Sequence, residues 1–196
     1  MSKAETTRFT ILQKAFEVIY VKGYQATSID EILSATQVTK GAFFYHFKNK
    51  DDMGLAMIQE ILYPGMYKAL VEPLLQANDP LHDIHHMLKV FLLENTKIQI
   101  KYGCPAVNLV EEMAPINPRF KKALSKLLTE WMTAIEKAVQ AGKSRGIVRK
   151  NVNQKQVAQF IVSGYSGIRN MGKLNNDVAC YKLFLKEVKN YLNSLS

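Results

Sequence analysis

Apolar residues recur at intervals of three and four positions along most of the chain, the spacing of one face of an α-helix. In the first segment this face comprises Leu12, Ala15, Phe16, Ile19 and Tyr20. Gly23 then follows as the expected helix stop. No stretch shows the strict alternation of apolar and polar residues that is typical of a half-buried strand. The pattern therefore predicts an all-α chain of about nine helices.

Capping residues divide the first fifty positions into three short helical segments. Thr27-Ser28, followed by Asp30 or Glu31, matches a capping box, and Thr39 is expected to cap the next helix. Asp51-Asp52 should open a longer helix, which Pro64-Gly65 should kink or interrupt near its middle. These signals predict an N-terminal three-helix domain over residues 1–50 and a C-terminal helical bundle over residues 51–196.

Proline after a capping residue marks later helix starts. Asn78-Asp79-Pro80 should open a helix that closes near Tyr102-Gly103, and Pro105 and Pro118 should begin two more. The last two helices are expected from about residue 153 and residue 177. Each carries apolar residues at helical spacing, as the members of a bundle do.

The run from Thr27 to Lys50 has the chemistry of a DNA-binding helix-turn-helix, because two short helices are joined by a tight turn. The second helix of this motif enters the major groove by its N-terminal residues. Base edges are therefore expected to meet Thr39, Lys40, Gly41, Ala42 and Phe44. The predicted phosphate contacts are Thr27, Ser28, Tyr45, His46 and Lys50. Phe43 and Phe47 should lock the helix to its neighbours; the alternative is a helical hairpin whose aromatic side chains only pack.

The stretch TSIDEILSATQVTKGAFFYHFKNKDDM resembles the DNA-binding region of TetR-type transcriptional regulators, and the resemblance covers about residues 8–55. It implies a homodimeric repressor, with an operator-binding N-terminal module and a bundle that binds an inducer and forms the dimer contact. Two positions depart from the family pattern. Phe44 stands where tyrosine is usual, and Gln37 replaces a turn glycine, which should cost a little strain.

Residues 101–113, KYGCPAVNLVEEM, resemble a Gly-Cys-x-x-x-Asn-Leu element of one branch of these regulators, some of which sense electrophiles or oxidants through a thiol. Cys104 directly precedes the helix expected at Pro105, where the helix dipole favours a thiolate. The resemblance implies sensing by Cys104, whereas the alternative is a small buried residue at a helix start. Other candidates for an inducer cavity, equally compatible with core packing, are Phe91, Tyr102, Met113, Trp131 and Met132.

By analogy with the same family, the last two helices should form the dimer face. The candidate interface residues are Phe160, Tyr165, Ile168, Phe184 and Val188.

Charge is unevenly distributed along the chain. The 196 residues carry 26 Lys/Arg and 17 Asp/Glu, a formal net charge of +9. Residues 1–60 hold equal numbers of basic and acidic side chains, so the whole excess lies in residues 61–196. DNA binding must therefore depend on where a few lysines stand and not on net charge.

Other classes of protein are poorly supported. Two cysteines and the lack of a run of about 18 apolar residues predict a cytoplasmic protein without a membrane span. His82 and His86 share a helix face, but no third ligand is near in sequence, so neither a metal nor a cofactor is expected. No enzyme signature is complete, and the competing class is the same fold acting mainly through a protein partner.

Overall fold

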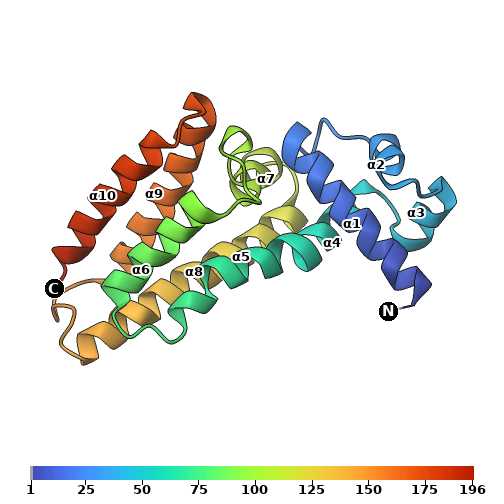
Figure 1. The fold of residues 1–196 in the computed structure, drawn as a ribbon. Coiled ribbons are helices and arrows are strands. Elements are labelled where there is room, and N and C mark those ends of the chain that lie inside the picture. Colours follow the sequence, from blue (N-terminus) through green and yellow to red (C-terminus); the bar gives the residue numbers. More distant parts are fainter. Residues whose placement is uncertain (1) are drawn as a thin grey trace. The chain divides into compact units, whose positions relative to one another are not determined.

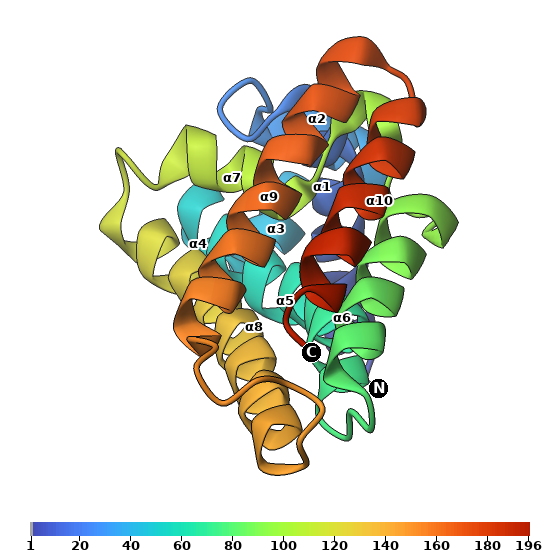
Figure 2. The same ribbon diagram turned by 90° about the vertical axis from the view of Figure 1, so that its left-hand side faces the viewer.

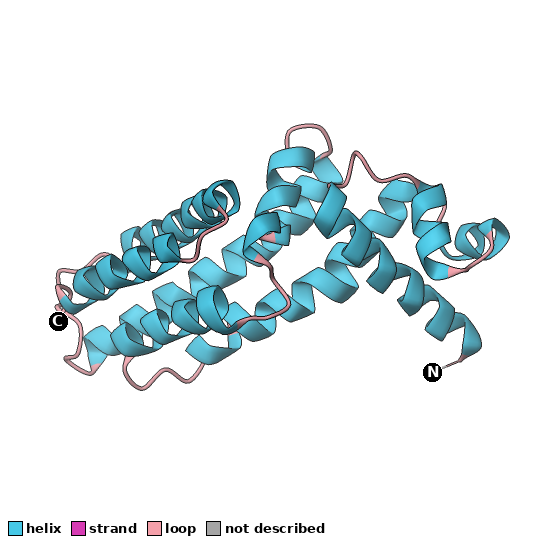
Figure 3. Ribbon diagram, turned by 45° about the horizontal axis from the view of Figure 1, so that its top comes forward, coloured by secondary structure: helices cyan, strands magenta, loops and turns pink. Residues whose placement is uncertain are grey.

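The computed structural model describes residues 2–196, and all regular structure in that range is helical (Figures 1 and 3). The α-helices are α1 Lys3–Lys22, α2 Ile29–Thr36, α3 Lys40–His46, α4 Lys50–Met57, α5 Tyr63–Leu70, α6 Pro80–Lys89, α7 Pro105–Met113, α8 Pro118–Ser144, α9 Gln154–Asn175 and α10 Ala179–Asn193. Short π or 3-10 segments are η1 Ile58–Leu62, η2 Glu72–Leu74, η3 Val90–Glu94 and η4 Ile100–Tyr102. The prediction of an all-α fold is confirmed. Because α4, η1 and α5 follow one another directly, they correspond to the one interrupted helix that was expected.

Two compact units divide the chain. The first comprises the chain up to Gly65 together with Pro105–Ser125, and the second comprises Met66–Cys104 and Lys126–Ser196. The assignment of DNA binding to residues 1–50, and of effector binding and dimerisation to residues 51–196, stays a prediction. Within residues 2–196, no helix is both long and apolar enough to cross a membrane.

Local capping explains where the helices of the first unit begin. Ser28 and Glu31 form the predicted capping box of α2, and the Thr39 hydroxyl accepts a hydrogen bond from Ala42 N at the start of α3. Gly23 ends α1 with φ 92°, a conformation that costs glycine little. The buried core that these helices share consists of Ile11, Leu12, Ala15, Ile19, Ile32, Phe43, Phe47, Met53 and Met57.

The interruption before α5 differs from the expectation in its form. The chain widens into a π-helical segment over Ile58–Leu62, in which the Tyr63 N–H donates to the carbonyl of Ile58. Pro64 lacks an N–H and cannot continue the α-helical ladder, whereas the first turn of a new helix tolerates it. The helix therefore resumes at Tyr63.

The expected helix from residue 79 to about residue 102 was too long. It ends at Glu94, and a separate 3-10 turn covers Ile100–Tyr102. The Asn95 side chain accepts a hydrogen bond from Lys97 N, which offers the backbone a turn in place of another helical residue.

In the second unit, α10 packs against both α6 and α9 (Figure 2). Close approach of α10 to α9 depends on Gly172, because a Cβ there would lie 2.4 Å from a ring carbon of Tyr181. Buried apolar side chains line this bundle, among them Ile84, Leu88, Ile135, Ile161 and Leu185.

Gly54 should be essential to the packing of the first unit. A Cβ at this position would lie 2.7 Å from Tyr24 Cε2 and 2.8 Å from Phe120 Cζ. We expect Gly54→Ala to lower the free energy of unfolding by about 1–3 kcal/mol in urea denaturation, because the two rings must shift. The matched control is Gly65→Ala, where the space is open and a gain of up to about 1 kcal/mol is expected. Equal stability of Gly54→Ala and the wild type would contradict this view of the packing.

Candidate DNA-binding site and effector region

Helix α3 has one buried face and one exposed face. Phe43 is fully buried and Phe47 is 3% exposed, so both hold the helix against its neighbours as predicted. The other aromatic side chains point away from this core, since Phe44 is 46% and Tyr45 78% exposed. The Phe44 ring lies edge-on to Phe43, with ring centres 5.3 Å apart, but much of its surface and most of Tyr45 stay open. They form a surface suited to contact with another molecule.

The N-terminal residues of α3 are open on the same surface. Thr39, Lys40 and Gly41 are exposed, and a Cβ at Gly41 would meet nothing within 4 Å. The Lys40 ammonium lies 3.7 Å from the Asp30 carboxylate, and both side chains are well exposed. Exposed pairs of this kind are worth at most about 1 kcal/mol, so Lys40 can leave Asp30 for a stronger acceptor.

Thr27 and Ser28, the two predicted phosphate contacts at the start of α2, differ in their exposure to solvent. Thr27 is fully buried and its hydroxyl donates to the carbonyl of Gly23 at 2.7 Å, so its placement argues against the predicted phosphate contact. Ser28 is exposed, but its hydroxyl and N–H are engaged with Glu31 in the capping box. The sequence pattern could not separate these neighbours, because both are good capping residues.

His46 and Lys50 lie beside the exposed surface and are only partly buried. Lys50 Nζ stands 4.4 Å from the centre of the Tyr24 ring and 3.5 Å from the carbonyl of Gln25. Burial lowers the pKa of Lys50, while the carboxylates of Asp51, Glu112 and Glu31 oppose the change. Its ammonium is thus already engaged, and a phosphate contact would require it to leave the Tyr24 ring.

The turn between α2 and α3 carries the expected strain. Gln37 adopts φ 56° and ψ 22°, the left-handed conformation that glycine adopts more readily. Its N–H still donates to the carbonyl of Leu33 at 3.0 Å, so the turn forms with glutamine in place of glycine.

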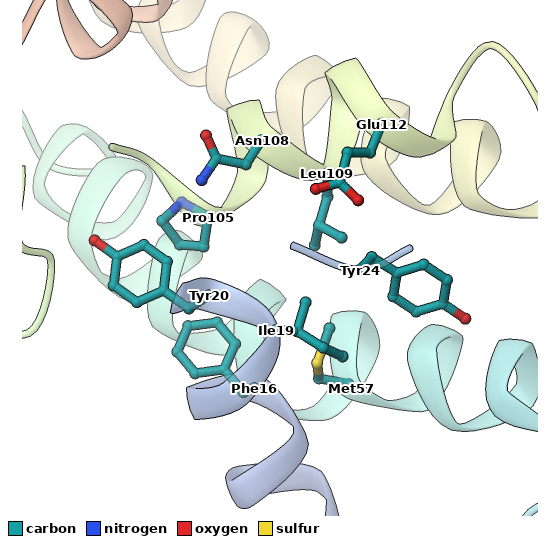
Figure 4. A pocket seen from close by; sticks show the side chains of 9 residues that line it. All are labelled: Phe16, Ile19, Tyr20, Tyr24, Met57, Pro105, Asn108, Leu109 and Glu112. Carbon is teal, nitrogen blue, oxygen red and sulfur yellow. The ribbon is translucent and has the colours of Figure 1, made fainter. Parts of the chain in front are cut away.

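Helix α7 holds the end of α1 within the first unit. The Glu112 carboxylate accepts a hydrogen bond from Gln25 N at 3.0 Å, and Asp51 accepts from the Tyr24 hydroxyl and from Asn117 Nδ2 at 2.7 and 3.0 Å. Figure 4 shows a pocket here, lined by side chains of α1, α4 and α7. Its volume of about 10 Å³ suits at most one water molecule, which excludes it as an effector site in this conformation.

The effector candidates fall in both units. Cys104 and Trp131 are each 1% exposed and lie in the second unit, whereas Met113 is buried in the first. Both Cys104 and Trp131 meet Tyr165: the thiol lies beside the Tyr165 hydroxyl, and the Trp131 ring lies edge-on with ring centres 5.1 Å apart. Tyr102 is partly exposed, and Lys101 Nζ lies 4.7 Å from its ring centre.

One functional candidate was missed in the sequence. Arg169 is 1% exposed and lies against the rings of Phe91, Tyr165 and Tyr181. Its position four residues after Tyr165 on the apolar face of α9 was the available signal, because a charged residue seldom occupies such a face.

The predicted dimer residues are only partly on the surface. Phe160 is 49% exposed, and Ile168 and Phe184 are half-buried. Tyr165 and Val188 are each 1% exposed and belong to the core, so their burial argues against the predicted dimer contact, which stays a prediction. The remaining exposed apolar surface of the last two helices and their connection comprises Met171, Leu174, Val178 and Leu183.

The chain matches two described sequence families. Residues 11–57 match "Bacterial regulatory proteins, tetR family", and residues 80–188 match "Tetracyclin repressor-like, C-terminal domain". The chain therefore belongs to the TetR family and is a DNA-binding transcriptional regulator. This membership favours DNA binding over the alternative of action mainly through a protein partner.

Individual relatives agree with this family. An uncharacterized HTH-type transcriptional regulator in the lacX 3' region of Lactococcus lactis subsp. lactis is 33% identical over 135 residues, covering 69% of each chain. The repressor NemR of Escherichia coli K12 is 22% identical over 191 residues, 95% of this chain and 94% of NemR.

Solved structures share the fold over nearly the whole chain. A TetR transcriptional regulator from Chloroflexus aurantiacus J-10-FL has a TM-score of 0.89 and 24% identity, covering 98% of this chain and 96% of that one. The reduced form of E. coli NemR has a TM-score of 0.84 and 21% identity, covering 94% and 96%. The helical arrangement is therefore that of TetR-type regulators.

Lys40→Ala should lower affinity for the preferred DNA sequence by about 1–3 kcal/mol and relax preference at one base position, because a base-reading donor is lost. Gel shifts on a set of single-base variants of the site would measure both effects. Lys14→Ala is the matched control, since it removes one exposed charge from α1 in the same unit. Uniform weakening on every sequence would contradict a base-reading role for Lys40.

Acid should weaken the capping box of α2. Hydrogen bonds from Lys22 and from Ser28 lower the pKa of Glu31 from 4.5 to about 2. A lowered pKa in the folded state stabilises the protein above about pH 4.5, and this contribution disappears as the pH falls to about 2. The melting temperatures of wild type and Glu31→Gln should therefore differ at neutral pH and converge in acid, with Glu17→Gln on α1 as control. A difference that does not change with pH would contradict this role.

Proposed function

We propose that the protein is a dimeric repressor, in which α3 of each protomer reads one half-site of an operator and an effector bound by the second unit releases the DNA. The proposal depends on the two faces of α3. Phe43 and Phe47 are buried on one face, whereas Lys40, Phe44 and Tyr45 are exposed on the other. Such a helix presents its N-terminal residues and one side to a groove while its other side holds it in place. The relative NemR of E. coli is a repressor, which supports repression as the direction of regulation.

Dimerisation is supported by the apolar surface of α9, α10 and the turn between them. Leu174 and Leu183 are 79% and 68% exposed, and the Phe160 and Tyr191 rings lie tilted to each other with ring centres 4.4 Å apart. A second copy of the chain would cover this surface around a two-fold axis. Two identical reading helices would then engage half-sites about 34–36 Å apart, or a multiple of that spacing.

Sensing through Cys104 stays a prediction. The thiol is 1% exposed and lies beside Tyr165, whereas a reactive cysteine needs access for its reagent. An effector that binds without a covalent bond must favour the state of the protein with low DNA affinity. Its site is proposed to lie in the second unit.

DNA upstream of the protein's own gene should be bound specifically in gel shifts, and footprinting should show two half-sites related by a dyad. Affinity should fall as salt rises, because bound phosphates release counterions. Sedimentation of the free protein should show a dimer. A scrambled DNA of equal length is the control, and equal binding of both DNAs at moderate salt would overturn the proposal.

A further inference from the structure

Arg169 stands out because it is the one charged side chain that is buried among residues 2–196. No carboxylate accompanies it: its hydrogen bonds within the described chain go to Tyr165 Oη at 3.1 Å, Tyr181 Oη at 3.5 Å and the carbonyl of Phe91 at 2.8 Å. A guanidinium has five N–H donors, so these three bonds leave two for another acceptor. Burying a cation without an anion costs several kcal/mol, which calls for a reason beyond packing.

A second buried donor adjoins the same ring. Trp131 Nε1 is the one buried side-chain nitrogen or oxygen without a hydrogen-bond partner in residues 2–196. Trp131 and Arg169 both contact Tyr165, with distances of 5.1 Å between the Trp131 and Tyr165 rings and 5.3 Å from Arg169 Cζ to the Tyr165 ring. Trp131 and Arg169 thus both offer N–H donors beside the Tyr165 ring. One ligand group with several acceptor atoms would bind them together.

We infer that this cluster is a binding site for a small monocarboxylate with a flat apolar body, an inference that rests on the proposed effector-responsive function. A carboxylate matches the planar fork of a guanidinium and offers about four acceptor positions, enough for Arg169 and the indole N–H. One cation neutralises one negative charge, so a monoanion fits better than a phosphate dianion. The rings of Phe91, Tyr165 and Trp131 offer aromatic surface to a flat apolar body.

The segment that contains Phe91 connects the proposed carboxylate site to the unit that contains the reading helix. Phe91 lies in the π-helical segment η3, and its carbonyl accepts from the same guanidinium, so a carboxylate on the two remaining N–H groups would compete with it. This segment lies at the end of α6 and leads through residues 95–104 directly into Pro105 of α7. Glu112 of α7 holds Gln25 N in the unit that contains the reading helix. Release of Phe91 by the ligand would therefore reach the DNA-binding unit along the chain.

The test uses benzoate and cinnamate as probes, with the neutral benzamide and cinnamamide as controls of the same shape. Trp131 is the sole tryptophan of the chain, so its fluorescence reports on this site directly. We expect the acids to change Trp131 fluorescence in a saturable way and to raise the melting temperature, while the amides do neither. Absence of both effects with both acids, or equal effects of acid and amide, would overturn the inference.

Variants separate this site from ordinary packing. Arg169→Met keeps the length of the side chain without the charge, and such replacements of buried charges are often neutral for stability. It should fold and lose roughly tenfold or more of its affinity for the acids, because a charge-assisted hydrogen bond is lost. Lys173→Met, which removes an exposed charge from the same helix, should bind as the wild type does. If Arg169→Met does not fold, Arg169→Lys should bind more weakly yet still prefer acid over amide; wild-type affinity in either variant would contradict the assignment.

Two further measurements separate the proposed carboxylate site from thiol sensing and from the proposed repressor function. Cys104→Ser should keep the response to the acids, since Cys104 is not among the predicted ligand contacts; loss of that response would contradict the assignment of the contacts. Gel shifts of the wild type with its upstream DNA are run with and without benzoate. Specific DNA binding without any acid response would leave the proposed repressor intact and end this inference. A response to the acids without specific DNA binding would support the carboxylate site and overturn the proposed repressor function.

Discussion

The burial of Phe43 and Phe47 decides the orientation of the reading helix, and with it the chemistry of the DNA-binding surface. Helix α3 has seven residues, far fewer than an isolated helix needs to be stable in water. Its direction therefore comes from these two rings in the core and from the Thr39 cap. Because these two rings occupy the buried side of α3, Phe44 and Tyr45 face outwards. Their apolar surface is then exposed to water unless another molecule covers it.

The first unit shows how parts distant in sequence support that surface. Glu112 holds the backbone at Gln25, and Asp51 joins Tyr24 to Asn117. Burial and the hydrogen bond to Asp51 raise the pKa of Tyr24, which therefore remains a neutral donor. These contacts tie α7 and the start of α8 to the module that carries the reading helix, so a displacement of α7 is felt at the end of α1.

In the second unit, Arg169 is the feature that ordinary stability does not explain. Burial acts to lower its pKa, but the neighbouring Tyr165, Cys104 and Tyr181 outweigh it, so the pKa is raised and the cation persists. The same surroundings raise the pKa of Tyr165, chiefly through burial, and keep the phenol neutral. A permanent charge without a carboxylate is costly in this core, and a receptor site for an anion is a physical reason to retain it.

By itself, the sequence determined the helical fold, the short helices of the reading head and the two sides of α3. These features depend on local rules: apolar spacing at three and four residues, Ser28 and Thr39 as caps, and glycine at Gly23. It also indicated the strain at Gln37, which arises within one turn. Such properties follow from neighbouring residues and can be read along the chain.

Tertiary structure decided which side chains remain available for contact. Thr27 and Ser28 are adjacent and chemically alike, yet Thr27 is fully buried and Ser28 is exposed. Tyr165 and Val188 were expected on the dimer face and lie in the core, whereas Leu174 and Leu183 are exposed. Arg169 acquires the Phe91 carbonyl from η3, 78 residues earlier in the chain, and the Tyr181 hydroxyl from α10, 12 residues later. Helical spacing places a residue on a face, but only packing between helices determines what that face meets.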